Sequence, residues 1–193
     1  MWGQRIMIWF TSDLHLCHDR EFVYKSRGFQ SVEDMNETLI NNINDCVKEE
    51  DILYILGDLG LGQNIDRVLS LLNRINCKEI YIIRGNHDTD NRIKEYINSL
   101  YNLKGIYDAK YLRYGKYHLY LSHYPTMTGN LEKEALTQMT LNLYGHTHQK
   151  SDFYNDIPYM YHVGVDSNFN CPVNVEDILH RMRLKMVECK NFL

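Results

Sequence analysis

The sequence predicts an α/β fold in which two β-sheets pack face to face and helices cover them. Over the first hundred residues, strand-like runs alternate with segments that have the period of an amphipathic helix. After residue 100 the chain is rich in tyrosine and alternates between apolar and polar positions, as half-buried strands do. Each half therefore supplies strands, and we expect them to form one domain over residues 1–193, a length that a single core can fill.

The first half is predicted to alternate buried strands with helices. Residues 31–50 carry apolar side chains at spacings of three and four, which predicts an amphipathic helix. Ser31 and Asp34 at its start match a helix-capping pattern. The expected strands lie at 5–10, 51–56 and 79–84, and the expected helices at 31–50, 64–75 and 91–100.

The second half is predicted to consist mainly of strands. Residues 107–125 alternate and carry Gly115 near their middle, which indicates a β-hairpin. Two further strands are expected at 139–145 and 159–165, and two helices at 131–138 and 175–185.

Composition narrows the classes of protein to consider. No apolar run approaches the roughly 20 residues that span a bilayer, so we expect no membrane segment. The five cysteines are widely spaced and odd in number, which argues against a disulfide framework and favours the cytoplasm. A net charge of −4 gives no overall field that attracts nucleic acid, and only a local patch near Arg20, Lys25 and Arg27 would provide one.

Polar residues capable of holding a metal follow several predicted strands. Side chains at i and i+2 of an extended segment point to the same side, so Asp13 and His15 can face one ion while Leu14 turns into the protein. His146 and His148 can do the same. Because ligands bind at the carboxyl ends of strands in open α/β sheets, loops from neighbouring strands should bring these residues together.

The candidate donors are nitrogen and oxygen atoms without a thiolate. Two aspartates, one asparagine and four histidines supply seven donors, which gives two ions four protein ligands each if one carboxylate is shared. Centres of this kind, with ions ~3.5–4 Å apart, serve in-line displacement at phosphorus, and a hydroxide that bridges the ions is the expected nucleophile. The seven are Asp13, His15, Asp58, Asn86, His123, His146 and His148.

In order and rough spacing, these residues resemble the five signature blocks of the calcineurin-like metallophosphoesterases. The likeness is to small bacterial and phage members, whose D-x-H-x-x-H opening ends here at His18 and whose late V-G-V-D stretch ends at Asp166. Cys17 and His162 depart from the pattern, although neither is a ligand in it. The matching blocks are Asp13-x-His15, Gly57-Asp58, Gly85-Asn86-His87-Asp88, His123 and Gly145-His146-Thr147-His148.

The resemblance implies a four-layer αββα sandwich, with two mixed β-sheets flanked by helices and a dinuclear site at one edge. It assigns His87 to the substrate, either to stabilise the phosphoryl oxygens or to protonate the leaving group. It further implies that Asp88 orients His87. The implied ligands are Asp13, His15, Asp58 and His148 for one ion, and Asp58, Asn86, His123 and His146 for the other.

Two further residues are candidates for substrate binding. His18 could reach the substrate or be an ordinary loop histidine, and Arg84 could bind a phosphate oxygen or be a solvated strand end. Asp88, too, has an alternative interpretation, as the cap of the helix that follows it.

The expected activity is metal-dependent hydrolysis of a small phosphate ester, either a monoester or a diester. We expect two divalent ions, with Mn²⁺ as the first choice and Fe, Zn or Ni as alternatives, in a monomer or homodimer. One alternative is a metal-dependent nuclease acting on DNA or RNA, which needs a basic groove with aromatic stacking. Another is a non-catalytic scaffold on the same fold; such proteins typically lose ligands, whereas here every ligand is present.

Overall fold

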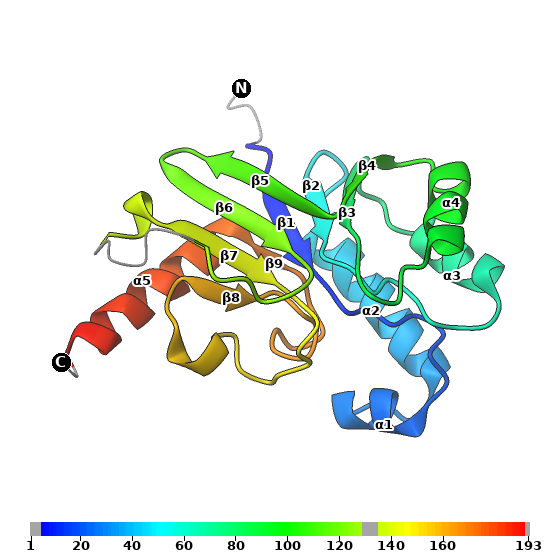
Figure 1. The fold of residues 1–193 in the computed structure, drawn as a ribbon. Helices are drawn as coiled ribbons and strands as arrows, with labels where there is room; N and C mark the ends of the chain where they lie inside the picture. The colour runs from blue at the N-terminus through cyan, green and yellow to red at the C-terminus, as the bar shows by residue number, and fades with distance from the viewer. Residues whose placement is uncertain (1–4, 129–134, 192–193) are drawn as a thin grey trace.

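The computed structural model describes residues 5–128 and 135–191. Its strands form two mixed sheets that pack face to face, with helices flanking them (Figure 1). The strand order is β4-β3-β2-β1-β9 in the first sheet and β5-β6-β7-β8 in the second. This arrangement confirms the predicted fold class.

The first sheet aligns the carboxyl ends of its central strands. β1, β2, β3 and β4 are parallel, and β9 runs antiparallel to β1. Thr11 at the end of β1 pairs with Ile55, and Ile55 pairs with Ile82, so the loops that follow these strands leave at one edge. The bounds are β1 (Ile8–Thr11), β2 (Ile52–Ile55), β3 (Glu79–Ile83), β4 (Leu103–Tyr107) and β9 (Val173–Asn174).

The second sheet begins with the predicted hairpin, which turns at Gly115 with a φ of 56°. β6 pairs in parallel with β7, and β7 in parallel with β8. Of the helix predicted at 131–138, residues 131–134 lie outside the described part of the chain, and a 3-10 turn follows at η2 (Leu136–Gln138). The strands are β5 (Ala109–Tyr114), β6 (Tyr117–Ser122), β7 (Thr140–Tyr144) and β8 (Met160–His162).

The helices α2, α3 and α4 cover the outer face of the first sheet and share one apolar cluster with β2 and β3 (Figure 1). The Ser31 side chain accepts a hydrogen bond of 3.1 Å from the Asp34 amide, which confirms the predicted cap of α2. The helical bounds are α1 (Glu21–Tyr24), η1 (Lys25–Arg27), α2 (Val32–Cys46), α3 (Ile65–Leu72), α4 (Asp90–Ser99), η3 (Tyr154–Asp156) and α5 (Val175–Asn191).

A second apolar cluster fills the space between the sheets. Phe10 and Tyr54 of the first sheet belong to the same cluster as Leu119 and Leu143 of the second. α5 contacts β1 and β9, and its Ile178 is fully buried in this cluster. No helix among the described residues is long and apolar enough to cross a bilayer. Because the two sheets are fixed by this shared core, the loops that follow β1–β3 and β6–β7 meet at a constant geometry.

Candidate metal centre

The first group of predicted donors meets beside the end of β1. The Nε2 atoms of His15 and His148 lie 3.0 Å apart, and Nε2 of His148 lies 3.8 Å from Oδ1 of Asp13. One donor atom from each of these three residues lies within 4.8 Å of the others. The three side chains therefore face one common point.

The second group of donors comes from loops after β3, β6 and β7. Oδ1 of Asn86 lies 2.9 Å from Nε2 of His123 and 2.9 Å from Nδ1 of His146. The two imidazole nitrogens are 3.3 Å apart. This group likewise surrounds a single point.

Asp58 lies between the two groups. Its Oδ2 atom is 3.7 Å from Nε2 of His15 and 3.6 Å from Nε2 of His123. The other oxygen, Oδ1, accepts a 2.9 Å hydrogen bond from the His87 amide, which fixes the carboxylate. One oxygen of Asp58 is thus available to both groups, as a shared ligand must be.

The chemistry of this cluster fits cations better than a network of hydrogen bonds. Asp13 is fully buried, and burial raises the pKa of its carboxyl group. Burial also lowers the pKa of His15 to about 2, so this imidazole is neutral and offers a lone pair. A buried carboxyl group that faces the same point as a neutral imidazole suits a divalent ion of the kind held by nitrogen and oxygen donors.

Five donor residues have backbone conformations that side chains seldom adopt. The φ angles are 57° at Asp13, 48° at His15, 55° at Asp58, 70° at His146 and 48° at His148. The expectation of an extended segment is therefore wrong both for Asp13 and His15 and for His146 and His148. Alternate residues take the left-handed conformation, yet these side chains still face the cluster and Leu14 is buried in the core. Strain of about 1–3 kcal/mol per residue is typical of functional sites.

The geometry of the site requires a residue without a β-carbon at position 145. A β-carbon at this position would lie 2.6 Å from Oδ2 of Asp13. The His146 amide that follows donates to both carboxylate oxygens of Asp13, at 3.1 Å and 3.0 Å. Glycine at 145 therefore lets the two loops approach closely enough for His146 and Asp13 to share the site.

A sequence profile described as calcineurin-like phosphoesterase matches residues 6–177, which is most of the chain. The chain belongs to the calcineurin-like phosphoesterase family. The matched segment contains every residue of the cluster, from Asp13 to His148.

Three relatives illustrate the range of similarity. A protein of unknown function from Aquifex aeolicus has the same fold, with a TM-score of 0.69, 23% identity, and coverage of 91% of this chain and 99% of that one. The gene 66 protein of Mycobacterium phage D29 is 29% identical over 191 residues, covering 83% of this chain and 88% of that protein. An uncharacterized protein of Methanocaldococcus jannaschii is 46% identical over 82 residues, which are 42% of this chain and less than half, 46%, of the archaeal protein.

Asp88 of this phosphoesterase does not contact the His87 imidazole, contrary to the expected orienting role. Its buried carboxylate instead accepts hydrogen bonds from backbone amides of Asp58, at 2.8 Å, Gly85, at 2.9 Å, and Leu59, at 3.3 Å. Asp88 is not the cap of α4 either, because Thr89 occupies that position. Asp88 therefore fixes the backbone that carries Asp58.

The two residues predicted to bind substrate lie in different surroundings. His18 lines the same cavity as His15 and His87, and its ring centroid is 5.6 Å from that of His15. Arg84 instead lines a separate hollow beside α4 and β4, where it forms a 2.6 Å ion pair with Asp90. The arrangement supports a position near the substrate for His18 but not for Arg84.

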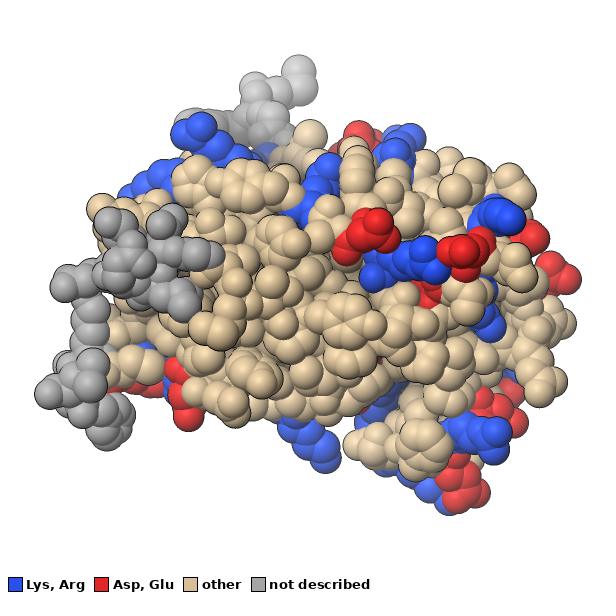
Figure 2. Space-filling view, viewed as in Figure 1, with Lys and Arg blue, Asp and Glu red and all other residues tan. Residues whose placement is uncertain are grey.

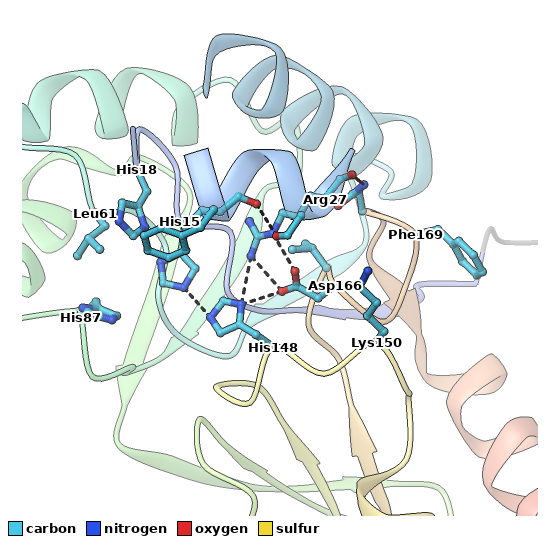
Figure 3. A pocket seen from close by; sticks show the side chains of 14 residues that line it. His15, His18, Arg27, Leu61, His87, His148, Lys150, Asp166 and Phe169 are labelled. Carbon is cyan, nitrogen blue, oxygen red and sulfur yellow. Dashed lines mark hydrogen bonds and ion pairs between the residues drawn. The ribbon is translucent and has the colours of Figure 1, made fainter. Parts of the chain in front are cut away.

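Two buried residues that support the candidate centre, Arg27 and Asp166, were not assigned a role from the sequence. The Arg27 guanidinium binds both oxygens of Asp166, at 2.9 Å and 3.0 Å, and donates to the carbonyls of Asp13, at 2.8 Å, and Leu14, at 3.1 Å. Asp166 in turn contacts Nδ1 of His148 (Figure 3). The V-G-V-D stretch was a signal for Asp166, whereas nothing in the local sequence distinguishes Arg27 from a surface arginine.

The charge of Asp166 follows from these contacts. Burial acts to raise the pKa of its carboxyl group, but hydrogen bonds from His148 and Arg27, with the positive charge of Arg27, outweigh burial and hold the pKa well below its usual range. Asp166 is therefore ionised, and its carboxylate can accept a hydrogen bond from Nδ1–H of the His148 ring. Arg27 does not contribute to a local basic patch on the surface, because its side chain is only 2% exposed and is paired with Asp166.

Proposed function

We propose that this chain hydrolyses a small phosphate ester at a centre that holds two divalent cations. The observation that carries the proposal is the position of Asp58 Oδ2, which lies within 3.7 Å of a histidine nitrogen in each of the two groups of donors. Asp13, His15 and His148 would hold one ion, Asn86, His123 and His146 the other, and Asp58 both. Family membership supports the hydrolysis of a phosphate ester, and the native metal is proposed to be Mn²⁺ in view of the oxygen and nitrogen donors.

When bound, a pair of such cations activates water as a nucleophile and polarises phosphoryl oxygens. Residues of the chain would hold the two cations in position. Asp58 is fixed by the His87 amide on one side and by the backbone that Asp88 holds on the other. His15 would offer a neutral imidazole, since burial lowers the pKa of His15 to about 2, and Asp13 would offer a fully buried carboxyl group.

His87 is the residue of the cluster that is best placed to act on the substrate. Its Nε2 lies 4.0 Å from Asp58 Oδ2, and 42% of its side chain is exposed. It lines the cavity together with His15 and His148. An accessible imidazole beside the reacting phosphate can donate a proton to the oxygen of the leaving group or hydrogen bond to a phosphoryl oxygen.

The experiment combines metal content with hydrolysis. Purified protein is analysed for metals, and rates are then measured on p-nitrophenyl phosphate and bis(p-nitrophenyl) phosphate with Mn²⁺, Ni²⁺ or Zn²⁺ added. We expect metal-dependent release of nitrophenolate that is lost in the His146→Ala/His148→Ala protein. Full activity of this variant in its metal-free form would contradict the mechanism. Bound metal with no hydrolysis of any phosphate ester would instead favour a non-catalytic scaffold.

The nuclease alternative has less support on this surface. Lys25, one of the three residues considered for a local basic patch, pairs with Glu21 at 2.7 Å. On the face shown in Figure 2, lysines and arginines form separate groups rather than one continuous basic surface. A polynucleotide substrate would be indicated by activity that falls steeply with salt on DNA or RNA and is absent on small esters.

A further inference from the structure

The two most exposed of the large apolar side chains, among the described residues, line the same cavity beside the metal centre. Phe169 is 88% exposed and Phe22 is 74% exposed. The cavity has a volume of about 840 Å³, and His15, His87 and His148 also line it (Figure 3). An exposed phenylalanine forgoes the free energy that burial would give it, so two at one cavity indicate a ligand that covers them.

Phe169 is held in place by its loop. Both Phe169, with a φ of 55°, and Asn170, with a φ of 60°, adopt the left-handed conformation. The Asn170 amide donates to the Val165 carbonyl at 3.0 Å, and the Cys171 amide to the Asn168 carbonyl at 3.0 Å. Asn168 is itself buried. A strained but well-anchored loop thus keeps an aromatic ring in solvent, which is the expected condition of a preformed binding surface.

The remaining walls of the cavity combine apolar side chains with the ion pair of Arg27 and Asp166 and, further out, with Lys150. Phe22 lies edge-on to His18, with ring centroids 6.0 Å apart, and Leu61 and Val165 also line the cavity. Lys150 lies near Phe169 at the other end, and it has no carboxylate partner among the described residues (Figure 3). A ligand there would meet apolar surface along its length and a cation at its end.

We propose that this cavity binds the organic part of the substrate, and that this part carries a planar aromatic ring, as a nucleoside does. The proposal rests on the proposed function, because the phosphate must lie at His15, His87 and His148. A group attached to that phosphate enters the cavity, whose volume is that of a small-molecule site. Phenylalanine rings stack on planar rings of any base, and Lys150 can contact hydroxyl or anionic groups of the same molecule.

The test compares substrates that differ only in the ring. Phosphate release is measured from AMP and from ribose 5-phosphate, which lacks the base. For the diester case, formation of the phosphomonoester from the methyl esters of both compounds is measured by chromatography. We expect kcat/KM to be about 5- to 100-fold higher for the compounds that carry adenine. Hexyl phosphate is the apolar comparison without a ring.

The variants Phe169→Ala and Phe22→Ala assign this preference to the cavity. We expect at least one of them to raise KM for the adenine compounds by about 5-fold or more while rates on ribose 5-phosphate stay unchanged. Phe169→Trp or Phe22→Trp, at the position where alanine has this effect, should keep the preference for the adenine compounds. Tyr111→Ala, which removes an aromatic ring that is 56% exposed on β5, is the matched control and should change neither substrate.

The possible outcomes separate this proposal from the proposed function. Hydrolysis of ribose 5-phosphate without a preference for adenine would overturn the aromatic subsite and leave the phosphoesterase activity intact. An equal preference for hexyl phosphate would also overturn it, because the walls would then recognise any apolar group. Failure to hydrolyse any of these esters, or either nitrophenyl ester, would contradict the proposed function itself. Binding of adenosine to the metal-free protein, measured by calorimetry and weakened in the phenylalanine variant, would then still support the subsite.

Discussion

Oδ2 of Asp166 lies 2.9 Å from Nδ1 of His148, on the side of the ring opposite the metal centre. Because the carboxylate can only accept, the proton of the neutral imidazole stays on Nδ1 and the lone pair of Nε2 points toward Asp13. The Arg27 guanidinium fixes Asp166 through two bonds and also fixes the carbonyls at 13 and 14. One buried arginine therefore positions two residues, Asp13 and His148, that are proposed to hold the same ion.

Asp166→Asn should weaken binding at the first ion position. An asparagine amide can donate to Nδ1, which would move the ring proton to Nε2 and remove the lone pair. We expect the affinity for one of two Mn²⁺ ions to fall about 10- to 100-fold, measured by calorimetric titration of the metal-free protein. Asp152→Asn changes an ion pair with Arg181, 3.5 Å long and outside the cluster, and should leave both affinities unchanged. Two unaltered affinities in Asp166→Asn would show that the contact does not position His148.

Arg27→Met should lower the free energy of unfolding by about 3–5 kcal/mol, because it leaves the Asp166 carboxylate, 11% exposed, without its partner. Urea denaturation of the metal-free protein measures this. Arg74→Met is the control: Arg74 also binds a carboxylate with two bonds, but it is 43% exposed, so a loss within about 1 kcal/mol is expected. Equal losses for the two variants would argue against a buried anchor at Arg27.

His87→Ala should keep both ions and lose rate. Its backbone amide, rather than its side chain, fixes Asp58, so alanine preserves that bond. We expect kcat on p-nitrophenyl phosphate to fall about 10²- to 10⁴-fold while metal content stays at the wild-type value. Loss of metal in this variant would assign the imidazole to binding rather than to the reaction.

His162 should make the metal-free protein less stable in mild acid. Burial lowers the pKa of His162 to about 4, whereas an unfolded histidine titrates near 6.5. As pH falls below 6.5, the unfolded chain takes up a proton that the folded protein refuses, so stability drops. From pH 7 to pH 5 this group should remove about 2 kcal/mol, and His162→Asn should remove that part of the pH dependence. An identical pH dependence in the variant would contradict the buried neutral state.

The fold was predictable where periodicity was strong. The helix at α2 and the hairpin around Gly115 follow from apolar spacing and turn chemistry, and both were predicted. β4 and β9 were missed, since β4 contains Gly105 and has no fully buried residue, and β9 has only two residues. Such strands form because neighbouring strands offer them an edge, which no local pattern encodes.

The residues that form the candidate site were predictable from the sequence, but the residues that hold them in position were not. Ordered blocks of Asp, His and Asn named the seven side chains that the structure brings together, because the residue types themselves indicate metal binding. Arg27 and Asp166 lie 139 positions apart and meet only through the fold. The left-handed conformation of Asp13 and His15 also depends on tertiary contacts. The backbone amides of these two residues donate hydrogen bonds to the carbonyls of Gly57 and Asp58, respectively.

The most direct test of the two-ion centre is anomalous scattering from a crystal grown with Mn²⁺. We expect two anomalous peaks on either side of Asp58 Oδ2, separated by ~3.5–4 Å, one beside His15 and His148 and the other beside His123 and His146. A single peak, or ions bound elsewhere while these side chains stay as they are, would contradict this expectation.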